Sequence, residues 1–157
     1  MDLDKLIPPT RSIVEDVVWA TLATVGSDGV PRTRVVHPVW WFEPDAIAGV
    51  VASRPTALKR AHIAAHPHVS LSYWSPAHDT AVVDARVRWA SRSELAEVWQ
   101  RIATTPEPLG YDPSPIWPDG PDSGDFAVLV LDPVRILTRP VGADALRWTR
   151  GDVPASA

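Results

Sequence analysis

The pattern of apolar and polar residues along the chain predicts a protein built mainly from β-strands. Most apolar segments are short and rich in β-branched or aromatic residues, such as VVWATLATV and VSLSYW, which is typical of strands. Asp28-Gly29 separates the first two of these segments and indicates a tight hairpin turn. The expected strands are residues 17–25, 32–42, 46–53, 69–74, 80–90, 126–131 with its continuation over 134–138, and 146–149.

Helical spacing interrupts this pattern in several places. The expected helices are residues 7–16, 56–66 and 93–103. Pro8 and Pro9 suit the first turn of the first helix. Thr10 or Ser12 would be its N-cap, and Thr56 is a natural N-cap for the second helix. Six or seven strands with interspersed helices predict a mainly β fold, a small antiparallel barrel with flanking helices.

The segment from residue 106 to residue 121 contains six prolines, which exclude a regular helix or strand there. It also contains Tyr111 and Trp117, which are unusual in a disordered linker. We therefore expect an ordered loop that lies over another part of the protein. We call residues 106–121 the proline-rich loop.

The length of 157 residues fits a single domain with one hydrophobic core, so residues 1–157 are assigned to one domain. Cysteine is absent, which excludes disulfides and thiolate chemistry. The N-terminal residues do not resemble a secretory signal, and no apolar stretch is long enough to cross a bilayer. A cytoplasmic protein without a membrane partner is therefore expected.

Basic residues gather in one part of an otherwise acidic chain. The chain has 15 basic and 19 acidic residues and a net charge of −4. The basic residues between positions 32 and 74 are Arg32, Arg34, Arg54, Lys59 and Arg60. Such a local cluster favours a small anion as ligand and argues against a nucleic-acid partner. The alternative is a solvated basic helix face.

Two of these residues, Arg34 and Lys59, and their neighbours suggest a phosphate site, where a strand ends and a helix begins. Thr56 and Lys59 open the expected helix, whose first backbone N–H groups are free to bind an anion. Arg34 supplies a guanidinium fork and Lys59 a point charge. The hydroxyls of Ser53 and Thr56 complete the set of donors.

Other kinds of chemistry find less support. His62 and His66 are four residues apart on the expected helix, a spacing that suits two metal ligands. Because no glutamate follows His62 and cysteine is absent, we predict no metal site. No serine lies in a nucleophile-elbow sequence and no carboxylate pair stands out. We therefore predict no catalytic side chain.

Two segments carry a resemblance to a known family. ATLATVGSDGVPRTRVVHPVW and ASRPTALKRAHIAAHPHVSLSYW resemble the flavin-binding split-barrel family related to pyridoxamine 5′-phosphate oxidase, and the resemblance extends over roughly residues 15–138. It implies a split antiparallel β-barrel and an FMN-binding oxidoreductase. Hydride transfer would be to or from an unidentified small-molecule substrate. It also implies a homodimer in which each site is built from both chains.

The resemblance also implies which residues bind the cofactor. The segment that begins at Arg34 would run along the flavin ring, and Lys59 would bind the phosphate. Leu58 stands where the family has an arginine, for which Arg60 or Arg54 would compensate, and Thr80 stands in place of a glutamine. The predicted cofactor-binding residues are Arg34, Val35, Val36, His37, Ser53, Thr56, Lys59, Arg60, Thr80 and Trp74.

Three alternatives to an FMN enzyme remain open. Related enzymes use the deazaflavin coenzyme F-420 on the same fold. A non-catalytic flavin-binding protein is a second alternative, and a haem-binding protein with His37 as ligand is a third. The family's C-terminal arginine and histidine for pyridoxamine phosphate have no match near residues 147–150, so the vitamin is not the expected substrate. We predict that the proline-rich loop lies near the dimer interface and the cofactor, rather than on its own barrel alone.

Overall fold

The computed structural model describes residues 2–151, so residues 1 and 152–157 lie outside this account. The chain forms one eight-stranded sheet in the order β2-β1-β5-β6-β7-β4-β3, with β8 paired to β7. The elements are α1 (Leu3–Val17), β1 (Ala20–Val25), β2 (Pro31–Val36), β3 (Pro38–Glu43), β4 (Ala46–Ser53), α2 (Ala57–Ala65), β5 (His68–Trp74), β6 (Thr80–Trp89), η1 (Arg92–Glu94), α3 (Leu95–Thr104), η2 (Gly120–Asp122), β7 (Ala127–Arg139) and β8 (Leu146–Thr149).

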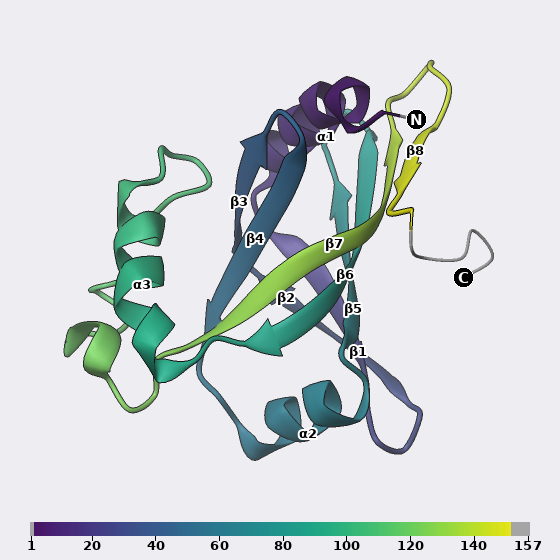
Figure 1. Ribbon diagram of the computed structural model, residues 1–157. Coiled ribbons are helices and arrows are strands. Elements are labelled where there is room, and N and C mark those ends of the chain that lie inside the picture. Colours follow the sequence, from purple (N-terminus) through teal and green to yellow (C-terminus); the bar gives the residue numbers. More distant parts are fainter. Residues whose placement is uncertain (1, 152–157) are drawn as a thin grey trace.

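All strand pairs are antiparallel. β2 and β3 stand at opposite ends of the strand order but follow each other directly in the chain, which curves the sheet into a split β-barrel. The main core fills this barrel with buried side chains from α1, α2, Leu109 and every strand except β2 and β8, and partly buried side chains of β2 and β8 pack against it. Figure 1 shows α1 and α2 at opposite ends of the barrel, with α3 to one side. The predicted mainly β barrel with flanking helices is confirmed.

The predicted strand 32–42 is two strands in the structure, because the chain breaks pairing at His37. The cause is local, since Pro38 restricts the backbone of the residue before it and has no N–H to donate. The predicted strand 126–131 continues over 134–138 past Pro133, as expected, and the two segments form the single strand β7. A register shift opposite Asp84 and Ala85 accommodates Pro133 within it.

Helix α1 begins at Leu3, not at residue 7, so Pro8 and Pro9 lie inside it. The prediction that Thr10 caps this helix is wrong, because Thr10 is buried and donates its hydroxyl to the Leu6 carbonyl, 2.8 Å away. Leu6 is also fully buried in the main core. The early start therefore comes from packing of the first turns on the sheet, which outweighs the cost of two prolines.

A second core lies between the sheet and α3, and it holds the proline-rich loop. Trp117 and Trp99 both make edge contacts with Phe126, at ring-centroid distances of 5.0 and 5.1 Å. The indole N–H of Trp117 donates to the Asp125 carbonyl. The loop thus packs on its own barrel and is ordered, as expected from its aromatic residues. None of the helices among residues 2–151 has the length and apolar character that a membrane span requires.

Candidate functional site

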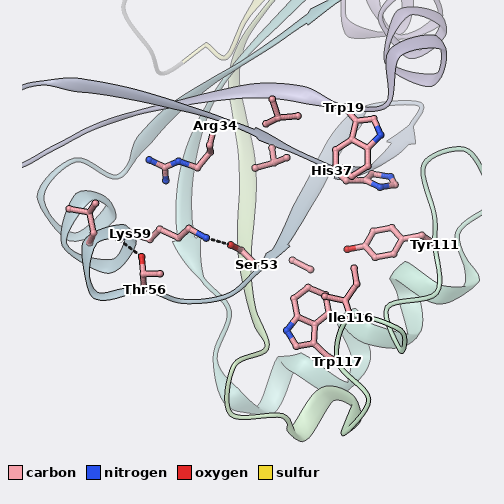
Figure 2. Close-up of a pocket in the computed structure, with 13 residues that line it drawn as sticks. Trp19, Arg34, His37, Ser53, Thr56, Lys59, Tyr111, Ile116 and Trp117 are labelled. Atoms are coloured by element: carbon pink, nitrogen blue, oxygen red, sulfur yellow. Dashed lines mark hydrogen bonds between the residues drawn. The ribbon is translucent and has the colours of Figure 1, made fainter.

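An open cavity of about 720 Å³ lies between β2, the end of β4, the start of α2 and the proline-rich loop. Figure 2 shows that its two ends differ, with basic and hydroxyl side chains at one end and aromatic rings at the other. A volume of this size is typical of sites for small molecules and cofactors. The lining residues are Trp19, Arg34, Val35, Val36, His37, Ala52, Ser53, Thr56, Leu58, Lys59, Tyr111, Ile116 and Trp117.

The basic end is built around Lys59 and Arg34. The Lys59 ammonium donates to the Ser53 hydroxyl at 2.6 Å and to the Arg54 carbonyl at 3.0 Å. Arg34 donates from one guanidinium nitrogen to the Thr24 hydroxyl at 2.9 Å. Neither cation forms an ion pair with any carboxylate among residues 2–151. This end of the cavity therefore carries two positive charges that protein anions do not neutralise.

The surroundings of Lys59 also favour an anion there. Partial burial and, to a smaller extent, the charge of Arg34 lower the pKa of Lys59. A bound anion would oppose both effects, since it would stabilise the protonated amine. Thr56 caps α2 as predicted, with its hydroxyl accepting the backbone N–H of Lys59 at 3.2 Å. The positive end of the helix dipole therefore adds to the two side-chain charges.

A narrow pocket of about 20 Å³ extends this basic end inward. It shares Arg34, Ser53 and Lys59 with the main cavity and is closed below by apolar side chains and Trp89. The indole nitrogen of Trp89 is buried without a hydrogen-bond partner among the residues described. Trp89 lines this narrow pocket together with the two cations.

A buried hydrogen-bond chain holds Arg34 in place from behind. The Thr24 hydroxyl lies 3.1 Å from Nδ1 of His62, and both residues are 2% exposed. The Arg34 guanidinium donates to the Thr24 hydroxyl, and the same hydroxyl is hydrogen-bonded to Nδ1 of His62. His66, the other candidate metal ligand on this helix, is exposed, and no group of three metal-ligating side chains occurs within residues 2–151.

The opposite end of the cavity is a row of three rings. The His37 ring lies 5.1 Å from Trp19 and 4.6 Å from Tyr111 between centroids. Nε2 of His37 donates to the Leu109 carbonyl at 2.9 Å. Burial lowers the pKa of His37 and raises the pKa of Tyr111 to about 12. Both rings are therefore uncharged near neutral pH, which leaves this end without formal charge.

The structure brings most of the predicted cofactor-binding residues together. Those that line the cavity are Arg34, Val35, Val36, His37, Ser53, Thr56 and Lys59. Arg60 does not line it and extends over the Trp89 ring, 5.2 Å from its centroid. Trp74 and Thr80 are register partners on β5 and β6 and are also absent from the cavity wall. Arg54 forms an ion pair with Asp125, so neither it nor Arg60 replaces an arginine at Leu58.

Several residues of the wall were not predicted from the sequence as parts of this chain's own site. Tyr111, Ile116 and Trp117 come from the proline-rich loop, and Trp19 precedes β1. The aromatic residues of this stiff loop were a usable signal, and the sequence had led us to expect the loop near the cofactor and the dimer interface. Nothing in the sequence around Trp19 distinguishes it from a core tryptophan.

The sequence profile of one family, described as pyridoxamine 5′-phosphate oxidase, matches residues 8–139. The chain belongs to this family. No curated protein matches its sequence. The match to the pyridoxamine 5′-phosphate oxidase family covers every element from within α1 to the end of β7. It therefore includes both ends of the cavity.

Three solved structures show the same fold as this member of the pyridoxamine 5′-phosphate oxidase family. An FMN binding protein from Nostoc punctiforme is 20% identical, with 94% of this chain and 88% of that chain covered and a TM-score of 0.63. A heme binding protein from Mycobacterium smegmatis is 20% identical, with coverage of 90% and 56% and a TM-score of 0.66. An F420 reductase is 18% identical, with coverage of 80% and 94% and a TM-score of 0.55.

Proposed function

We propose that the cavity binds FMN and that the protein is an FMN-dependent oxidoreductase acting on a small molecule. One observation carries this proposal: Arg34 and Lys59 lack a carboxylate partner within residues 2–151 and stand beside the start of a helix. A phosphate satisfies that arrangement, and a flat ring satisfies the aromatic end of the same cavity. The FMN binding protein with this fold adds support.

The residues of the basic end hold the phosphate. Lys59 and Arg34 donate charge-assisted hydrogen bonds, and Ser53 and Thr56 supply hydroxyl groups at the end of β4 and the start of α2. β2 is an edge strand, paired only with β1. The outward backbone N–H groups of an edge strand have no strand partner. They are available to the ring of the cofactor where Val35 and Val36 line the cavity.

FMN supplies hydride chemistry when bound, and the protein supplies position and electrostatics. The aromatic end contributes apolar walls and neutral rings, which exclude water from a stacked substrate. No acid–base side chain is assigned, because the pKa of His37 is lowered by burial and its Nε2 is engaged with Leu109.

The deazaflavin coenzyme F-420 is the second candidate, because an F420 reductase shares the fold. The ring and the phosphate of this coenzyme would require the same aromatic end and basic end of the cavity as those of FMN. Haem ranks lower, although a heme binding protein shares the fold, because Nε2 of His37 already donates to the Leu109 carbonyl. A flavin-binding protein without turnover has the same binding site, and only an activity assay separates it from an enzyme.

The protein also forms a homodimer in this proposal. Trp74, Val35 and Trp19 are 66%, 68% and 57% exposed, which is high for side chains of this kind. A partner that covers some of these side chains would remove them from water. Sedimentation of the wild-type protein tests the dimer, and a monomer at all concentrations would contradict it.

The test of the binding proposal compares FMN with riboflavin, which has the same ring but no phosphate. Protein free of cofactor is titrated with each ligand and flavin fluorescence is followed, for wild type and for Arg34→Ala, Lys59→Ala and the double variant. Charge-assisted hydrogen bonds contribute roughly 1.5–3 kcal/mol each. We expect the double variant to lose several kcal/mol of FMN affinity and little riboflavin affinity.

Arg32→Ala is the matched control, because Arg32 is on the same strand but pairs with Asp28 and does not line the cavity. Its FMN affinity should equal that of wild type. If the double variant retains wild-type preference for FMN over riboflavin, the basic end does not hold the phosphate. The absorption spectrum of the purified protein distinguishes FMN, deazaflavin and haem directly.

A further inference from the structure

The proline-rich loop presents Tyr111 to the cavity in a fixed position. The two residues before Tyr111 are both held in place. Leu109 is buried in the main core and its carbonyl accepts from His37. At Gly110 the chain passes so close to the Thr105 carbonyl that any Cβ there would clash with it. Tyr111 also stacks on His37. Its ring is thus preorganised before any ligand binds.

The hydroxyl of Tyr111 stands out among the polar atoms at this end of the cavity. Nε2 of His37 donates to the Leu109 carbonyl and Nε1 of Trp117 donates to the Asp125 carbonyl. No hydrogen bond of Tyr111 to another side chain or to the backbone occurs within the described part of the chain. Figure 2 shows its oxygen directed into the cavity, toward the space between the two ends.

The walls around this oxygen are flat and uncharged. Trp19, Ile116 and Trp117 line the cavity together with Tyr111, and none of them carries charge. In the proline-rich loop, the carboxylate of Asp112 is engaged elsewhere, since it accepts from Ser114. A charged ligand group would lose hydration here without gaining an ion pair, whereas a flat neutral ring would bury apolar surface.

We propose that Tyr111 is a substrate-binding residue whose hydroxyl donates a hydrogen bond to a flat, uncharged ring compound carrying a carbonyl or similar acceptor. This inference rests on the proposed function, because it assigns the substrate class of the same site. The basic end of the cavity holds the cofactor. The part of the cavity wall that the proline-rich loop forms with Tyr111, Ile116 and Trp117 faces the substrate. Burial raises the pKa of the phenol, so its hydroxyl is protonated at neutral pH and can donate to such an acceptor.

The experiment uses two probes that differ in their acceptors. Menadione is a flat neutral ring system with two carbonyls, and 2-methylnaphthalene has the same ring size and methyl group but no acceptor. Binding of each to the oxidised, FMN-loaded protein is measured by calorimetry without any reductant, so that no turnover occurs. We expect wild type to bind menadione more tightly, and Tyr111→Phe to lose about two- to tenfold of menadione affinity with 2-methylnaphthalene unchanged.

Ser114→Ala is the control within the loop, because it removes the hydroxyl contact to Asp112 and leaves the cavity wall intact. Its discrimination between the probes should match wild type. Equal loss of both probes in Tyr111→Phe would indicate a packing role only and would overturn the proposal. If the wild-type protein does not bind menadione more tightly than 2-methylnaphthalene, the proposal is overturned without the need for any variant. Wild type that fails to bind FMN refutes the proposed function instead, and the probes are then compared on the unloaded protein.

Discussion

Thr24 does not line the main cavity, yet the structure predicts that it controls anion binding there through Arg34. Its hydroxyl bridges Arg34 at 2.9 Å and His62 at 3.1 Å. Thr24→Val keeps the size of the side chain and removes both hydrogen bonds. The Arg34 guanidinium then keeps its charge but loses the partner that orients it.

Two effects of Thr24→Val should be separable. Loss of one orienting hydrogen bond should weaken FMN binding by about two- to tenfold. The unsatisfied Nδ1 of the buried His62 should lower the free energy of unfolding by about 1–3 kcal/mol, which corresponds to a fall of roughly 2–12 °C in Tm for a protein of this size. Thr24→Ser retains the hydroxyl and should stay close to wild type in both measurements.

A double-mutant cycle with Arg34→Ala identifies the route of the effect. If Thr24 acts through Arg34, Thr24→Val should weaken FMN binding in the wild-type background and have no further effect once Arg34 is alanine. The loss of stability should persist in both backgrounds, because it comes from His62. The reasoning would be refuted if Thr24→Val weakened FMN binding by the same factor with Arg34 present and with Arg34→Ala. It would also be refuted if Thr24→Val alone left the FMN affinity unchanged. Flavin fluorescence titration and thermal unfolding supply the two readouts.

Two further predictions concern stability. Gly49→Ala should cost about 1–3 kcal/mol in chemical unfolding, with FMN affinity of the folded protein unchanged, because the added Cβ would clash with the buried Trp40 ring; an unaltered unfolding midpoint would contradict this. Hydrogen bonds from Arg88 and Ser91 lower the pKa of Glu94 from 4.5 to about 2. Its carboxylate therefore stabilises the fold above pH 4.5 and loses this contribution as the pH falls toward 2. Wild type should be more stable than Glu94→Gln at pH 7 and no more stable near pH 2, and a constant difference across this range would contradict the assignment.

The sequence alone determined those features that depend on neighbouring residues. Alternation marked most of the strands, Asp28-Gly29 marked the first hairpin, and Thr56 marked the start of α2. The residues of the basic end were also recognisable. Ser53 and Lys59 are only six positions apart across one strand-to-helix junction, so a local pattern brings them together.

The tertiary structure decided what depends on residues far apart in the chain. His37 meets Leu109 across 72 positions, and Thr24 meets His62 across 38. No local pattern encodes such pairings, because they arise only when the barrel closes and the proline-rich loop settles on it. For the same reason the early start of α1 was missed, since burial of Leu6 against the sheet outweighs the local preference of Pro8 and Pro9. Residues close together in the sequence thus specified much of the basic end of the cavity, whereas contacts between residues far apart in the chain specified its aromatic end.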